Sequence, residues 1–325
     1  MDKRYLGRIP NINNFEEKVC REICESYGFG DFESYSVIET GYEDFNFVLT
    51  TNSGKYFVKV FSKTRKPEDC KRITDLLAFL MIKRVHHPKI YKDMSGDYLH
   101  KINIGIENLF LVVMDFIDGK NFFELNAAPN KKEIVQLAND MAQINSIKLK
   151  GELSHIYDSW AILNFGLEYE KKKKYLKNNE IKIFEPLINE FNSTDFEKLP
   201  KSLVHGDLLK TNVLKDKLGK IWIVDFSVAN LYPRILEIAI AATHLLFDSS
   251  KEKTAENLKT LLEEYGKHIK LTHEEKEVLP KFMQFSYAIE YLNTIIEERV
   301  KRNKSNENCS LHEEAKTGLE WGDLL

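Results

Sequence analysis

Residues 203–226 read LVHGDLLKTNVLKDKLGKIWIVDF, and this stretch decides how the rest of the chain is interpreted. Its apolar residues fit buried strand positions on both sides of a turn. That interpretation does not account for four polar residues at the edges of the strands: His205, Asp207, Asn212 and Asp225. Polar groups next to a core need partners there. A metal ion together with a reacting phosphate would supply those partners.

The spacing of these four residues suits phosphoryl transfer, which needs a neutralising metal and a carboxylate that orients the attacking hydroxyl. Asp207 follows a glycine in a turn, where its carboxylate could face a substrate hydroxyl. Asn212 and Asp225 could both reach Mg²⁺, because oxygen ligands suit this hard cation. A hairpin that turns at residues 216–219 would bring them together. His205 is interpreted as a residue that orients the turn by a hydrogen bond, rather than as the base.

The segment HGDLLKTNVL and the following IWIVDF resemble the HGDxxxxN catalytic loop and the metal-binding Asp of the aminoglycoside phosphotransferase and choline kinase family. That family is a small-molecule branch of the protein-kinase-like fold. The resemblance implies that Asp207 is the catalytic base and that Asn212 and Asp225 hold Mg²⁺, with ATP as the donor. It also implies an α+β fold of two lobes. Residues 1–118 would form a small nucleotide-binding lobe with an antiparallel sheet, and residues 119–325 a helical catalytic and substrate-binding lobe.

The hydrophobic pattern along the chain predicts the same two parts. A helix is expected at residues 12–28, and the sequence Asn-Ser-Gly at 52–54 is typical of a hairpin turn. Pro67 opens a second helix with apolar residues at helical spacing. After Gly119 the pattern is helical except for the hairpin within 203–226, and Asn130 with Glu133 forms a predicted capping box. Strands are expected at residues 34–40, 45–51, 55–61, 98–104 and 109–117.

Residues 39–60, ETGYEDFNFVLTTNSGKYFVKV, resemble the nucleotide loop and the following strands of the family. The resemblance implies that Gly41 and the backbone amides up to Asn46 cover the phosphates. Lys59 is expected to contact the α- and β-phosphates, and its alternative role is that of a solvent-facing lysine on a half-buried sheet. Such a lysine normally pairs with a helix carboxylate, but the expected position falls on an isoleucine. The candidate partners in that helix are Glu68, Asp69 and Asp75, with Ile73 at the expected position.

Residues 111–119, LVVMDFIDG, resemble the hinge of the family. The resemblance implies that adenine bonds the backbone carbonyl of Asp115 and the backbone N–H of Ile117. Gly119 would then let the chain turn into the helical lobe. The alternative is an ordinary strand that ends in a turn.

Composition narrows the range of partners. The chain has 325 residues, of which 43% are hydrophobic and 30% charged, with a net charge of −3, so no overall field selects nucleic acid. Its four cysteines have no CxxC spacing and no nearby histidine set, which disfavours zinc. No stretch approaches 18 uninterrupted apolar residues. We expect a cytoplasmic protein whose partner is a small molecule, without nucleic acid or membrane.

The predicted activity is transfer of the γ-phosphate of ATP to a hydroxyl of an amino-alcohol, homoserine, a sugar or an aminoglycoside. A protein Ser/Thr kinase is an alternative, but only six residues separate Phe226 from Pro233, which leaves no room for an activation segment. An inactive nucleotide-binding module is the other alternative. Such modules usually lose the base or a metal ligand, and this chain retains all three of these residues.

The acceptor is expected in a concave pocket walled by residues 155–175 and 285–325, because a compact pocket suits a small ligand. Tyr232 and Trp321 are candidate lining residues. Several acidic residues of the C-terminal helices could receive a cationic acceptor, although most should be surface charges: Glu290, Glu297, Glu298, Glu313 and Glu314.

Overall fold

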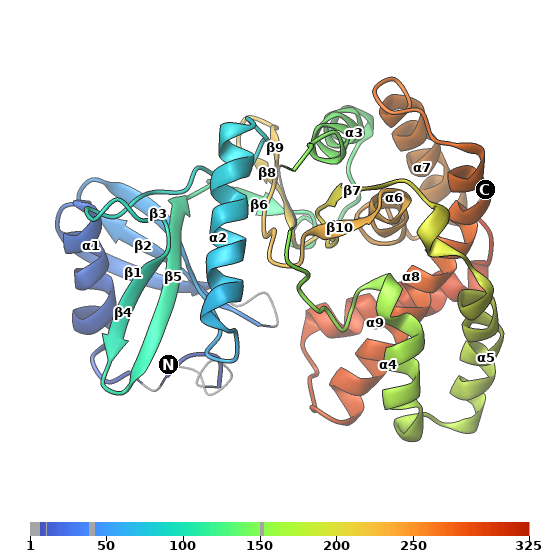
Figure 1. Cartoon of the computed structure of the whole chain (residues 1–325), viewed down its shortest axis with the longest axis horizontal. Helices are drawn as coiled ribbons and strands as arrows, with labels where there is room; N and C mark the ends of the chain where they lie inside the picture. The colour runs from blue at the N-terminus through green and yellow to red at the C-terminus, as the bar shows by residue number, and fades with distance from the viewer. Residues whose placement is uncertain (1–6, 11, 39–42, 150–152, 325) are drawn as a thin grey trace. The chain divides into compact units, whose positions relative to one another are not determined.

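The computed structural model describes residues 7–10, 12–38, 43–149 and 153–324. Its internal contacts divide the chain into two compact units, residues 1–119 and residues 120–325. The first unit contains a β-sheet with two helices, and the second is mostly helical with short strands (Figure 1). Each unit is described by itself below.

The first unit is built on a five-stranded antiparallel sheet with the strand order β1-β2-β3-β5-β4. Residues 51–54 form the tight turn between the second and third strands, as the Asn-Ser-Gly sequence predicts. Phe45, Phe47 and Leu49 are buried on one face, while the residues between them are half-buried. The strands are β1 (Phe32–Ile38), β2 (Phe45–Thr51), β3 (Gly54–Val60), β4 (His100–Ile104) and β5 (Glu107–Asp115).

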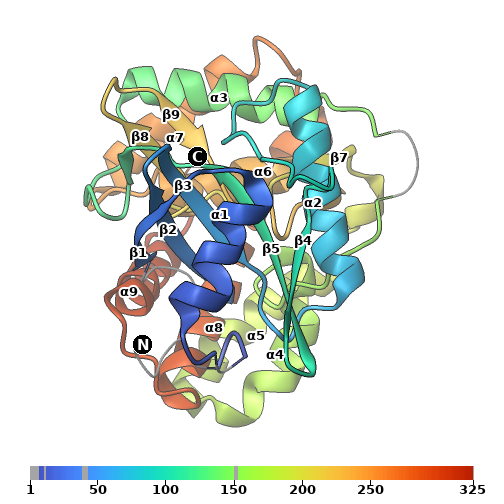
Figure 2. The same cartoon turned by 90° about the vertical axis from the view of Figure 1, so that its left-hand side faces the viewer.

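Two helices cover opposite faces of this sheet (Figure 1, Figure 2). A helical turn at Glu16–Cys20 leads into α1 (Arg21–Tyr27), which packs with the sheet in one aromatic and aliphatic core. Helix α2 (Pro67–Ile82) contacts β5 from the other side. Since side chains alternate along a strand, Lys59 points to the face opposite its core neighbours Val58 and Val60.

Two small sheets of the second unit contain residues 203–226, the segment on which the sequence interpretation rests. Strands β7 (Lys201–Val204) and β10 (Asn230–Pro233) pair antiparallel, with Val204 opposite Asn230. Between them, β8 (Val213–Asp216) and β9 (Ile221–Ile223) form the predicted hairpin, which joins β6 (Gly119–Asn121) in a three-stranded sheet. Asp216 fixes the hairpin turn by accepting from the N–H groups of Leu218 and Lys220.

The rest of the second unit is helical, as predicted. The capping box at Asn130 and Glu133 is present at the start of α3. Helices α8 and α9 lie side by side in both views, and Gly318 makes this possible, because a Cβ there would lie 2.3 Å from the ring of Tyr287 (Figure 1, Figure 2). The helices are α3 (Lys131–Asn145), α4 (Phe165–Lys172), α5 (Asn178–Ser193), α6 (Ile235–Ile240), α7 (Lys251–Tyr265), α8 (His273–Arg299) and α9 (Asn306–Trp321).

Among the residues described, none of the helices combines the length and apolar character that crossing a membrane would require.

Candidate active site

The polar turn at residues 205–207 is held by a carboxylate from another element. The backbone N–H groups of His205 and Gly206 donate to the two carboxylate oxygens of Glu237 in α6, at 2.8 and 3.0 Å. Gly206 has φ +81°, a conformation that favours glycine, and a Cβ there would contact the carbonyl oxygen of Val228 at 3.4 Å. Burial raises the pKa of Glu237 to about 7, although the two N–H donors favour its charged form. Glu237 therefore braces the turn from inside the core.

His205 orients this turn. Its side chain is fully buried, its Nε2 lies 2.9 Å from the carbonyl oxygen of Val224, and its Nδ1 accepts from the N–H of Asp207 at 3.2 Å. Nε2 must therefore carry the hydrogen. Burial lowers the pKa of His205 to about 4, so the ring is neutral at pH 7. With both nitrogens engaged, the ring is placed to position Asp207 rather than to take a proton from a substrate.

Asp207 is partly exposed at the tip of the turn, and Asn212 holds one of its carboxylate oxygens. The Asn212 amide nitrogen donates to Asp207 Oδ2 at 2.7 Å and to the Asp207 carbonyl at 3.0 Å. Burial raises the pKa of Asp207 well above its usual range, and the charges of Asp158 and Asp225 raise it further. Asp207 thus lies among other carboxylates, an arrangement that a bound cation would stabilise.

Asn212 and Asp225 fit a Mg²⁺ site. Because the Asn212 nitrogen faces two acceptors on Asp207, the amide oxygen is directed away from Asp207. The backbone carbonyl of Asn212 accepts from the backbone N–H of Val224 at 3.0 Å. This bond places Asn212 beside Val224, the neighbour of Asp225 in the sequence. Asp225 has φ +65°, an uncommon value for a non-glycine residue, and its Oδ1 accepts from the N–H and hydroxyl of Ser227.

The number of protein ligands also suits this ion. Within the part of the chain that the structure describes, no three His, Cys, Asp or Glu side chains converge as a metal-binding group. Mg²⁺ is commonly held by one or two carboxylates together with waters and substrate phosphates, so it does not need such a group. One carboxylate and one amide oxygen at adjacent ends of a hairpin match that pattern.

In the first unit, Lys59 is buried and paired with a carboxylate. Lys59 is only 4% exposed, so the solvent-facing alternative is wrong. Its Nζ lies 3.0 Å from Asp44 Oδ2, and Arg65 binds the other oxygen of the same carboxylate at 2.9 Å. The signal that sequence reasoning missed is Asp44, the second residue of the segment EDFN at residues 43–46. Asn46 pairs with Lys59 across the β2–β3 ladder, so a residue just before β2 is within reach of the lysine.

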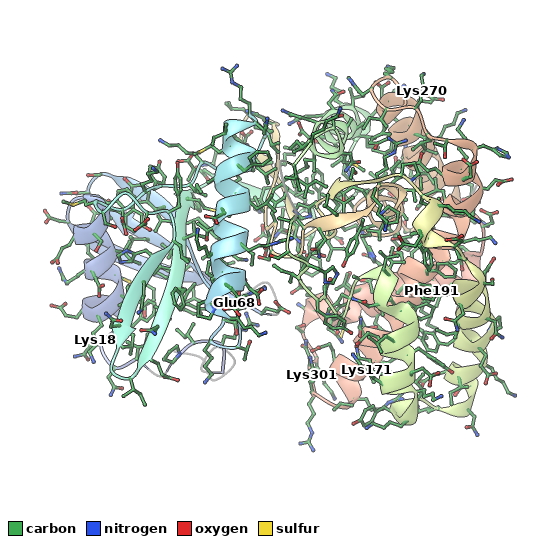
Figure 3. All side chains as sticks on the ribbon, viewed as in Figure 1. Lys18, Glu68, Lys171, Phe191, Lys270 and Lys301 are labelled. Carbon is green, nitrogen blue, oxygen red and sulfur yellow. The ribbon has the colours of Figure 1, made fainter. Side chains whose placement is uncertain are left out.

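The helix carboxylates considered for this partnership are directed elsewhere. Glu68 is exposed near the N-terminal end of α2 (Figure 3), Asp69 is in its first turn, and Asp75 pairs with Lys71 on the surface at 2.7 Å. The position of Ile73 is buried, since α2 presents apolar residues to the sheet. The sequence left the partner of Lys59 unresolved, and the structure gives it as Asp44 rather than Glu68, Asp69 or Asp75.

The other residues of this unit that were predicted to bind the nucleotide are Gly41, Asn46, Asp115 and Ile117. Gly41 lies outside the described residues. Asn46 lies inside β2 rather than in the loop before it, because the alternating pattern already begins at Phe45. Asp115 ends β5, where its carboxylate accepts from the hydroxyl of Tyr91 at 2.6 Å, and Ile117 follows the strand.

A recess in the second unit adjoins the catalytic loop. The loop immediately after Asp207 and helix α9 both contribute to its lining. Lys210 of the loop pairs with Glu314 of α9, with Nζ 2.9 Å from Oε1. Of the two segments expected to wall the acceptor pocket, residues 285–325 contribute Glu307, Ser310, Leu311 and Glu314 to the lining of this recess and residues 155–175 contribute none, so the position of the acceptor stays a prediction. The residues lining the recess are Phe123, Leu209, Lys210, Thr211, His244, Glu307, Ser310, Leu311 and Glu314.

Tyr232 and Trp321, the two aromatic residues predicted to line the acceptor pocket, do not line this recess. The hydroxyl of Tyr232 lies 2.8 Å from His155 Nε2, and its side chain is buried. Trp321 stacks on Phe247 with ring centroids 4.9 Å apart. Both side chains are engaged in contacts outside the lining of the recess.

Asp158 is a neighbour of Asp207 that sequence reasoning did not single out. Its segment, SHIYDSW at residues 154–160, is irregular and carries no motif. The side-chain amide of Asn230 fixes that segment by bonding both the N–H and the carbonyl of Ile156, at 3.2 and 2.9 Å. After burial, the charge of Asp158 has the largest effect on the pKa of Asp207. Only the fold brings the two carboxylates together.

Known proteins resemble this chain in sequence and in fold. The sequence model of the phosphotransferase enzyme family (APH) matches residues 34–276. A homoserine kinase of Zymomonas mobilis is 23% identical over 249 residues, which are 76% of this chain and 76% of that protein. Among solved structures, amicoumacin kinase hAmiN, in complex with AMP-PNP, Ca²⁺ and Ami, has a TM-score of 0.72 and 16% identity, covering 100% of this chain and 97% of that one.

The choline kinase LicA of Streptococcus pneumoniae is also similar, with a TM-score of 0.66 and 16% identity over 95% of this chain and 100% of that chain. These likenesses confirm the predicted α+β, protein-kinase-like fold, in which an antiparallel sheet precedes a largely helical part.

Proposed function

We propose a residue-level mechanism for this chain, which belongs to the phosphotransferase enzyme family and is an ATP-dependent kinase of a small-molecule hydroxyl. In this mechanism, residues 1–118 bind the nucleotide, and residues 119–325 carry the catalytic turn and the acceptor. The observation that carries the proposal is the Asp207–Asn212 hydrogen bond of 2.7 Å, beside a turn braced by Glu237.

Asp207 accepts the proton of the acceptor hydroxyl. The hydroxyl oxygen forms a bond to the γ-phosphorus, the bond from that phosphorus to the bridging oxygen breaks, and ADP leaves. Asn212 holds Asp207 Oδ2, so the carboxylate keeps one orientation, and His205 fixes the backbone of the turn. The amide oxygen of Asn212 and the carboxylate of Asp225 would hold Mg²⁺, which supplies neutralisation of the phosphate charge when bound.

For the nucleotide, Lys59 is the cation for the α- and β-phosphates, and Asp44 holds its ammonium group in place. The backbone of Gly41 through Asn46 covers the phosphates. The carbonyl of Asp115 and the N–H of Ile117 bind adenine. The support for these roles is the family resemblance, together with the buried ion pair at Lys59.

The acceptor is a compact molecule that carries an amine as well as the hydroxyl. Support comes from the homoserine kinases among the sequence relatives and from the carboxylates that surround Asp207. A peptide acceptor is disfavoured by the short chain after Asp225, because β10 begins at Asn230 and pairs at once with β7. That connection leaves no activation segment to dock a peptide.

Transfer of phosphate from radiolabelled ATP to four matched alcohols tests this function. Homoserine carries an ammonium and a carboxylate, 3-amino-1-propanol only the ammonium, 4-hydroxybutanoate only the carboxylate, and 1-propanol neither. We expect transfer to the two amines in the presence of Mg²⁺, and its loss in the Asp207→Asn variant. Transfer to protein substrates, with none to these alcohols or to a wider panel of sugars and aminoglycosides, would overturn the proposal.

A further inference from the structure

A buried carboxylate in the first unit is shared by two cations. Asp44 is 5% exposed, and its Oδ2 lies 3.0 Å from Lys59 Nζ. Arg65 reaches both oxygens of this carboxylate, with Nε 2.9 Å from Oδ1 and Nη2 3.3 Å from Oδ2. The backbone N–H of Ser62 donates to Oδ1 at 2.9 Å. Each oxygen of Asp44 therefore has two partners, and the two-point contact with the guanidinium fixes the plane of the carboxylate.

These partners come from β3 and from the loop at residues 61–66 that joins it to α2. Ser62 and Arg65 lie in that loop, whereas Asp75 of α2 pairs with Lys71 on the surface. Because a planar guanidinium with two bonds holds a carboxylate more firmly than a single ammonium does, Arg65 is the group that orients Asp44. Lys59 is thus oriented by a carboxylate that the loop itself holds.

The same guanidinium also holds the residue before Asp44. Arg65 Nη2 lies 2.5 Å from Glu43 Oε2, and the side chain of Glu43 is 62% exposed. Residues 43 and 44 precede β2 and belong to the segment that is expected to cover the phosphates. Water screens the exposed charge of Glu43, so the three buried side chains, two cations and one carboxylate, together carry an excess positive charge. An excess positive charge at the end of this segment favours a polyphosphate ligand.

We propose that Arg65 is a positioning residue of the nucleotide site, which acts by holding Asp44 and, through it, the ammonium group of Lys59. This inference rests on the proposed function and adds the residue that orients the phosphate-binding lysine. In protein kinases a glutamate of the helix after this strand pairs with the lysine, so the position of that helix controls activity. Here the orienting group lies in the loop before α2, so the affinity for the phosphates depends on that loop and not on the carboxylates of α2.

The Arg65→Gln variant tests this role, with Lys63→Gln as the matched control. Lys63 is an exposed residue of the same loop, so its replacement removes the same charge from the surface. Calorimetric titration in the presence of Mg²⁺ gives the ratio of the affinity for ADP over that for adenosine, which isolates the contribution of the two phosphates. We expect Arg65→Gln to lower this ratio about 10-fold, because it leaves the buried Asp44 without its two-point contact. Lys63→Gln and the α2 variant Asp75→Asn should change the ratio by less than about twofold, since exposed charges contribute little.

The conservative variant Arg65→Lys separates orientation from charge. An ammonium group keeps the charge but cannot make the two-point contact, so the ratio should recover only in part, to about threefold below the wild type. Full recovery in Arg65→Lys, an unchanged ratio in Arg65→Gln, or an equal loss in either control variant overturns the proposal. If Arg65→Gln fails to fold, Arg65→Lys alone decides, because a wild-type ratio in that variant overturns the role. Failure of the proposed function would appear separately, as a wild-type protein that binds ADP no more tightly than adenosine.

Discussion

The catalytic turn and the recess beside it lie in the same unit and differ in how their buried polar atoms are satisfied. At the turn, both oxygens of Glu237 accept backbone N–H groups, and both nitrogens of His205 are engaged. Beside the recess, which His244 lines, its Nδ1 lies 2.7 Å from Glu290 Oε2, and burial raises the pKa of Glu290 well above its usual range, so the hydrogen of a neutral carboxyl satisfies the pair.

This difference teaches how the two regions divide the work. A group that reacts must be held in one orientation before the substrate arrives, so the bonds around Asp207 are made within the chain. A buried pair away from the reacting groups has only to satisfy its own polar atoms, as the neutral His244 and Glu290 do between themselves. The predictions below test whether the two regions behave in these different ways.

The largest expected effect belongs to Asp207. Asp207→Asn removes the base while keeping the shape of the side chain, so kcat should fall by about 10²-fold or more. The affinity for ATP, measured by calorimetric titration, should stay close to that of the wild type. A variant that retains near-wild-type turnover would contradict the role of this residue and, with it, the assignment of the catalytic turn.

The pH dependence of stability should reflect the neutral His205. Its folded pKa of about 4 lies below the unfolded value of about 6.5, so its contribution to stability is present above pH 6.5 and is lost as the pH falls through 4. The loss amounts to about 3 kcal/mol at full protonation. Urea unfolding between pH 7 and pH 4 measures it.

A matched variant isolates this contribution. His205→Asn keeps a polar side chain but cannot be protonated, and it should show a smaller loss of unfolding free energy over the same pH range. If the wild type and His205→Asn lose the same free energy, the depressed pKa of His205 is not the cause, and the turn is less tightly organised than its hydrogen bonds suggest.

The smallest effect is expected at Lys210. Its charge is held by Glu314, so Glu314→Gln should leave Lys210 available to a carboxylate on the acceptor. The preference for homoserine over 3-amino-1-propanol, as a ratio of kcat/KM, should rise by about threefold, which is typical of a partly exposed ion pair. Glu313→Gln changes the exposed neighbour on α9 and serves as the control. An equal rise in both variants would indicate a general charge effect rather than release of Lys210.

The sequence was sufficient for the features that local rules determine. Alternating and helical patterns predicted the sheet, α2 and the helical second unit, and the spacing of Asp207, Asn212 and Asp225 predicted the hairpin that brings the last two together.

What the sequence did not reveal depends on contacts between distant segments. Asp158 reaches Asp207 from an irregular segment, and Glu290 meets His244 only because α8 packs against the end of α6. The partner of Lys59, which the sequence left unresolved, is Asp44, and strand register places it beside the lysine. Register and helix packing follow from the whole core rather than from any local pattern.

The most direct test of the central contrast compares two glutamine variants of buried glutamates, Glu237→Gln and Glu290→Gln, without substrate at pH 8. Glu237→Gln turns an N–H₂ group toward backbone donors, so the free energy of unfolding should fall by about 2 kcal/mol. Glu290→Gln replaces a neutral carboxyl with a neutral amide that can donate to the same His244 Nδ1, so the free energy of unfolding should change by less than about 1 kcal/mol. Urea unfolding curves for the wild type and both variants measure these changes. A loss in Glu237→Gln with little change in Glu290→Gln is the predicted result, and an equal loss in both variants would contradict the account.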